Sequence, residues 1–136
     1  MTAVEQSLHE ALRAGAEGLY ALEAGTGLLI AHGSWPGRKD FGQFIRTDDS
    51  ITSPGTELAS IDWGAAITAL NAGEFPSSSG EKHMFRLAAS LAGDVPVRLG
   101  DAVTGIDGRN VSLLVKAVLH AAGQRQSEED EDEKKH

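Results

Sequence analysis

Three short polar residues stand directly before stretches in which apolar residues recur every three or four positions. Ser78 is followed three residues later by Glu81, which is the S-x-x-E pattern of a helix capping box. Asp62 and Asp107 precede the other two stretches and favour the N-cap position, because their oxygens accept hydrogen bonds from free backbone N–H groups. These helix-start signals restrict the second half of the chain to short helices joined by brief connections.

The spacing of apolar residues in this half predicts three longer helices and one short helical turn. The helices are expected over 63–72, 79–92 and 108–122, and the turn over 101–105. Pro96 disfavours helical backbone before it, and 97–99 is expected to be extended. In the last helix the side chains expected to face the core are Val111, Leu114, Val115, Val118 and Ala122.

The first half is less well determined by its pattern. Thr2 and Glu5 form another capping box, T-x-x-E, and predict a helix over 2–15. Residues 16–31 fit either a second helix, which their Leu, Ala and Glu content favours, or a hairpin of GLYALEA and LLIAHGSW. Residues 33–60 are rich in glycine and proline and are expected to be loops, with FGQFIRT forming a short strand or a helical turn.

The composition favours a helical core built from small and aliphatic side chains. Aromatic residues make up 5% of the chain and hydrophobic residues 40%, so most of the core must be Ala, Leu, Ile and Val. A length of 136 residues fits one domain. We therefore expect a mainly α protein: a compact single-domain bundle of about five helices over 1–123, with a loop-rich middle in which a short hairpin is an alternative.

The acidic charge is concentrated at the C-terminal end. The net charge is −8, and the last ten residues hold six acidic residues and two lysines. Residues 124–136 contain no large apolar side chain and are expected to be a disordered acidic tail. The rest of the chain is mildly acidic, which argues against a broad nucleic-acid surface. Because neither a signal peptide nor a membrane-length apolar run is seen, a cytoplasmic location is expected.

The sequence contains no recognised pattern of catalytic or metal-binding residues. The absence of cysteine excludes disulfides, thiol catalysis and cysteine-bound zinc. HEALR begins like the metalloprotease motif H-E-x-x-H, but Arg13 stands where the second histidine ligand is required. Phosphate-loop and nucleophile-elbow patterns are missing as well. We therefore predict neither an enzyme nor a metal or cofactor site.

The loop-rich middle combines aromatic and cationic residues, which is the composition of many binding hot spots. These side chains either bind a protein partner or cover the core where loops cross it. The candidate partner-binding residues are Trp35, Arg38, Phe41, Phe44 and Arg46.

A second candidate site is the predicted three-helix unit over 79–122, which has the layout of a helix-turn-helix DNA-binding unit. In that arrangement Arg109 would contact guanine and Asn110 adenine. Alternatively, Asp107 is simply an N-cap and the polar residues after it are solvated. The candidate nucleic-acid-binding residues are Lys82, Arg86, Arg109, Asn110, Ser112 and Lys116.

The run DWGAAITALNAGEFPSSSGEKHMFRLAASLAG, followed by LGDAVTGIDGRNVSLLVKAVLHAAG, resembles a group of small, mainly helical actinobacterial proteins with no established activity. The resemblance covers roughly 16–123. It implies a bacterial intracellular protein and carries no catalytic residue over. Together these observations predict a small interaction or regulatory module that binds protein partners and self-associates, with a DNA-binding regulator as the alternative.

Overall fold

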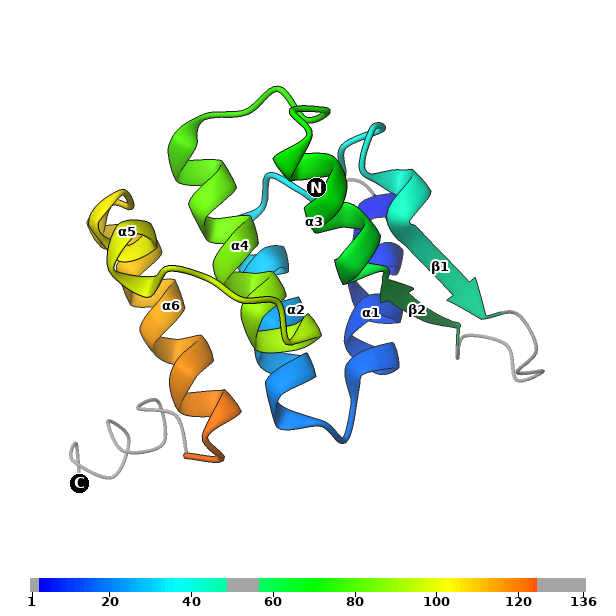
Figure 1. Ribbon diagram of the computed structural model, residues 1–136. Coiled ribbons are helices and arrows are strands. Elements are labelled where there is room, and N and C mark those ends of the chain that lie inside the picture. The colour runs from blue at the N-terminus through cyan, green and yellow to red at the C-terminus, as the bar shows by residue number, and fades with distance from the viewer. Residues whose placement is uncertain (1–2, 49–56, 125–136) are drawn as a thin grey trace.

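The computed structural model describes residues 3–48 and 57–124, which form a mainly α-helical bundle (Figure 1). Within these ranges the chain has six α-helices, one 3-10 helix and a two-stranded antiparallel sheet. The elements are α1 (Ala3–Ala16), α2 (Tyr20–His32), η1 (Gly42–Phe44), β1 (Ile45–Asp48), β2 (Leu58–Ile61), α3 (Trp63–Asn71), α4 (Ser79–Gly93), α5 (Leu99–Thr104) and α6 (Gly108–Ala121).

Helix α2 is the central element, and it packs against α1, α4 and α6 (Figure 1). The segment 16–31, which fitted either a helix or a hairpin, is helical from Tyr20 onward, and 17–19 form the turn between α1 and α2. Its consecutive residues Leu28, Leu29 and Ile30 are all buried. A helix covered on several sides is apolar around much of its circumference, and this weakens the periodicity that identifies an amphipathic helix.

The predicted helix caps are confirmed in the second half. The Asp62 carboxylate accepts a hydrogen bond from the Ala65 N–H at 3.1 Å, and the Asp107 carboxylate accepts one from the Asn110 N–H at 2.9 Å. Ser78 and Glu81 form both bonds of the capping box, at 3.2 and 3.0 Å. These bonds satisfy backbone donors that have no partner inside the helix.

The loop-rich middle includes a small hairpin-like sheet. FGQFIRT contains both alternatives, a 3-10 turn in η1 followed by strand β1. Strand β1 pairs with β2 from Ile45 opposite Ile61 to Asp48 opposite Leu58. Strand β2 packs on α1 and buries Ala59 and Ile61. Most of β2 lies within 33–60, which the sequence predicts to be loops, because a strand of four residues is too short to show the alternation of apolar and polar residues.

The predicted inward face of α6 is wrong in part. Leu114 is buried, together with Asn110 and Ala117. Val111, Val115 and Val118 are exposed, with exposed fractions of 39%, 51% and 48%, and Ala122 is also exposed. Helix α6 thus buries the row that begins with the polar Asn110 and leaves the row of valines exposed. Helix α5 begins at Leu99, so the expectation of extended backbone over 97–99 is wrong at its last residue.

Some expectations fall outside the described residues. They are the cap at Thr2 and the disordered tail beyond Gln124. In the part of the chain that the structure describes, no helix has the length and apolar character needed to cross a membrane.

Candidate functional site

The aromatic residues of the middle loop lie in the core. Trp35 and Phe41 are fully buried at 0% exposure and pack against Phe75 and Phe85, with ring centroids 5.0–6.1 Å apart. The Trp35 indole N–H donates a hydrogen bond to the Glu81 carbonyl oxygen at 3.1 Å. The loop therefore closes the bundle over α4, as the covering alternative describes.

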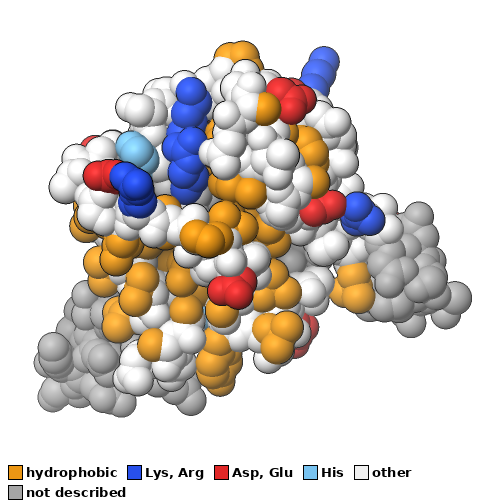
Figure 2. Space-filling view, viewed as in Figure 1, with side chains coloured by type: hydrophobic (Ala, Val, Ile, Leu, Met, Phe, Trp, Pro, Cys, Tyr) orange, Lys and Arg blue, Asp and Glu red, His pale blue; other side chains and the backbone are white. Residues whose placement is uncertain are grey.

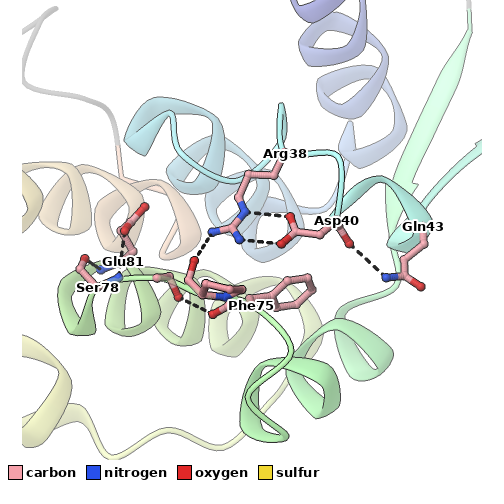
Figure 3. Close-up of polar contacts among 8 residues, drawn as sticks. Arg38, Asp40, Gln43, Phe75, Ser78 and Glu81 are labelled. Atoms are coloured by element: carbon pink, nitrogen blue, oxygen red, sulfur yellow. Dashed lines mark hydrogen bonds and ion pairs between the residues drawn. The ribbon is translucent and has the colours of Figure 1, made fainter.

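Arg38 fixes this loop from outside the aromatic cluster (Figure 3). Its guanidinium donates to both carboxylate oxygens of Asp40 at 2.8 and 2.6 Å and to the Pro76 carbonyl oxygen at 3.0 Å. It also lies 4.8 Å from the Trp35 ring centroid, in cation–π range. These hydrogen bonds hold the pKa of Asp40 below its ordinary value.

The five predicted partner-binding residues are thus in different environments. Trp35 and Phe41 are inaccessible, and Arg38 is held by the contacts just described. Phe44 is half-buried, whereas Arg46 is exposed and pairs with Asp62 at 2.8 Å. Partner binding through this loop stays a prediction, and Arg46 with parts of Arg38 and Phe44 offers surface for it.

The predicted nucleic-acid set is also divided. On α4, Arg86 donates to the Asn71 side chain of α3 at 3.1 Å. On α6, Arg109 donates to the Ala31 carbonyl oxygen at the end of α2, at 3.2 Å. Asn110 is buried at 8% exposure. Lys82 is half-buried on α4, Ser112 is exposed on α6, and Lys116 lines a groove. Asn110 is therefore not accessible to a base edge.

The exposed row of α6 forms an apolar surface that we call the valine face, defined by Val111, Val115, Val118 and Ala122. Figure 2 shows hydrophobic side chains gathered at the lower left, in the region of α4 and α6. The Lys and Arg side chains visible in this view lie higher or at the right. The residues of the face are spaced four, three and four apart, which is the a/d spacing of a coiled-coil seam.

A groove lies on the other flank of α6, between α6, α2 and the end of α1, with a volume of about 550 Å³. We call it the α1–α2–α6 groove. Small residues make the space, because Ala24, Gly27, Ala31 and Ala117 line it where larger side chains would fill it. The groove is not predictable from the sequence pattern, because the residues that line it come from three helices. Of these residues, only Lys116 is in a candidate set.

The groove holds a short contact between His120 and Glu23 among further polar groups. His120 Nε2 lies 2.8 Å from a Glu23 carboxylate oxygen, and the Gly18 N–H donates to the other oxygen at 3.0 Å. The Gly18 hydrogen bond and then the His120 contact lower the pKa of Glu23. The Tyr20 ring meets the His120 ring edge-on at 5.7 Å. Arg13 and Lys116 also line the groove.

Within the described ranges, no group of three or more His, Asp or Glu residues is arranged to hold a metal ion. No family model, curated protein or solved structure matches this chain. The candidate functional surfaces are therefore the valine face and the α1–α2–α6 groove, one on each flank of α6.

Proposed function

We propose that this chain is a small interaction module that self-associates through the valine face of α6. The observation that carries the proposal is the exposure of three valines at coiled-coil spacing on a helix that already buries a different row against the core. The cytoplasmic location and the regulatory role expected from the sequence belong to the same proposal.

A second copy of the chain is the occupant that best fits this face. The flanking seam positions Ser112 and Leu119 are uncharged, and the charged residues of α6 lie elsewhere on the helix. Two copies with net charge −8 would therefore bring no like charges into the seam. An antiparallel pair would also set each helix N-terminus beside the partner's C-terminus, which is the favourable dipole arrangement.

The chain's own C-terminal segment is a poor alternative cover. Residues 125–136 contain no hydrophobic residue, so they have no apolar surface to offer the valines. Helix α6 has 14 residues. At 1.5 Å per residue it is about 21 Å long, and a seam of this length with its neighbours buries roughly 1,000 Å² over both copies. That area predicts a weak dimer with a dissociation constant of about 10–100 µM.

The test is sedimentation equilibrium of the full chain from about 10 µM to 1 mM, across the range set by the expected affinity. We expect a monomer–dimer equilibrium, and a monomer throughout for Val115→Lys, because two buried ammonium groups would face each other. Gln6→Lys, on the exposed surface of α1, changes the charge equally and should dimerise like the unchanged chain. A monomeric unchanged chain, or an unaltered dimer in Val115→Lys, would refute the proposal.

The DNA-binding alternative has one observation in its favour, which is the succession of helices α4, α5 and α6. Against it, the outer surface of α6 presents valines, and Asn110 is buried. Phosphate contacts bind more tightly as salt falls. A mobility-shift assay at low ionic strength is therefore the sensitive test, and a salt-dependent shift lost in Arg109→Gln would favour DNA binding.

A further inference from the structure

The α1–α2–α6 groove has the size and shape of a small-molecule site. Its volume of about 550 Å³ lies within the roughly 300–1,000 Å³ typical of ligand pockets. Its walls are mostly apolar, and Ala24, Leu28 and Ala117 are buried residues that also belong to the core. The interior would therefore hold a hydrocarbon chain against firmly packed helices.

Two of the four polar side chains that line the groove are cations. Arg13 and Lys116 come from α1 and α6, and His120 stands one turn beyond Lys116. The one acidic residue in the lining, Glu23, already accepts hydrogen bonds from the Gly18 N–H and pairs with His120. Arg13 and Lys116 bring two positive charges to the lining against the one negative charge of Glu23, on a chain with net charge −8. Such a local reversal of sign favours an anionic ligand.

The helical spacing separates this site from the valine face. Leu113, Lys116 and His120 lie on one flank of the buried row of α6, and Val111, Val115 and Val118 lie on the other. A ligand in the groove would therefore not occupy the proposed dimer seam, and each site can be tested while the other is intact.

We propose that the α1–α2–α6 groove binds an amphipathic monocarboxylate, with its carboxylate between Arg13 and Lys116 and its hydrocarbon chain over Gly27. An alanine Cβ at position 27 would have only the Arg13 guanidinium within 4 Å, at 3.7 Å. The space above Gly27 is therefore open, and the Arg13 head group lies at its edge. A groove of this volume with only a few cationic groups fits a small molecule with one charged end better than an acidic protein surface.

The experiment is isothermal titration of the full chain with straight-chain carboxylates from hexanoate to dodecanoate, below their micellar concentrations. We expect affinity to rise about two- to fourfold per added methylene, as burial of a CH₂ group predicts. The alcohol of equal length should bind at least about tenfold more weakly, because it offers no charge to the guanidinium. Equal binding of the alcohol, or no binding of dodecanoate, would overturn the proposal.

Three variants locate the site. Arg13→Gln should weaken dodecanoate binding about tenfold, whereas Lys39→Gln, an equal charge change at an exposed loop residue, should leave it unaltered. Gly27→Leu should fill the groove and abolish binding, with circular dichroism confirming that the chain is folded. Val115→Lys should bind dodecanoate normally even as a monomer. Equal effects of Arg13→Gln and Lys39→Gln would place the anion elsewhere.

Discussion

Gly25 lies where α2 and α4 approach each other closely. Its replacement by alanine therefore tests how these two helices pack. An alanine Cβ there would stand 2.5 Å from the Ala88 carbonyl oxygen and 2.5 Å from the Ala92 Cβ. Ordinary carbon contacts are about 3.5–4.0 Å, so the two helices must separate by roughly 1 Å at this point. The opposing atoms belong to the backbone and to a Cβ, neither of which can rotate away.

Two effects of opposite sign determine how much Gly25→Ala changes the free energy of unfolding. Alanine is favoured over glycine inside a helix by about 1 kcal/mol. Overpacking a close contact costs about 1–3 kcal/mol, and a rigid neighbour puts Gly25→Ala near the upper end. We therefore expect a net loss of about 2 kcal/mol in the free energy of unfolding, which for a chain of this size lowers the melting temperature by roughly 6–10 °C.

Gly27 supplies the matched control two residues further along the same helix. Its Cβ would meet only the Arg13 guanidinium at an ordinary 3.7 Å, so Gly27→Ala should stabilise the chain by about 1 kcal/mol. Urea and thermal unfolding followed by circular dichroism, at one fixed protein concentration, measure both changes. If Gly25→Ala were as stable as the unchanged chain, or matched Gly27→Ala, the close packing of α2 on α4 would be wrong.

Three further predictions concern the core and its titratable groups. Trp35→Ala should lower the free energy of unfolding by about 3–5 kcal/mol, measured in urea, because it removes a fully buried aromatic ring and its bond to Glu81; a loss below about 1 kcal/mol would contradict the core assignment. The pKa of Glu23 is lowered from 4.5, chiefly by the hydrogen bond from the Gly18 N–H and then by the His120 contact, so its ionised form stabilises the fold above that pH and this stability is lost as the pH falls below it; Glu23→Gln should flatten the stability profile there, and an unchanged slope would count against these two contacts. Burial lowers the pKa of His32 from 6.5, so protonation favours the unfolded chain; stability should fall as the pH drops below 6.5, and a His32→Gln variant with the same slope would disprove this cause.

The helices of the second half could be predicted because their signals are local. The caps at Asp62, Ser78 and Asp107 each act within three residues, and a local signal is complete in the sequence. Which face of α6 is buried is not local information. The rows Asn110–Leu114–Ala117 and Val111–Val115–Val118 have the same spacing, and the apolar pattern favours the second row, because the first begins with a polar side chain. The packing of α6 on α2 nevertheless buries the first row.

The sites were harder to predict than the fold for a related reason. Trp35 and Phe41 are residue types common in binding surfaces, but they are among the largest side chains available to a core that contains few aromatic residues. The α1–α2–α6 groove arises from small residues spread over three helices, and small residues give no pattern of their own. Its charged residues Arg13 and Glu23 come together only through the packing of α1 and α2.

The distribution of aromatic side chains gives this protein its own optical reporters. Trp35 and Trp63, the two tryptophans of the chain, are buried in or beside the aromatic cluster. Their emission therefore follows the integrity of the core. The single tyrosine, Tyr20, is exposed and touches His120 at the groove. Tryptophan can be excited at wavelengths that tyrosine does not absorb, so emission excited there reports on the interior alone, in the unlabelled chain.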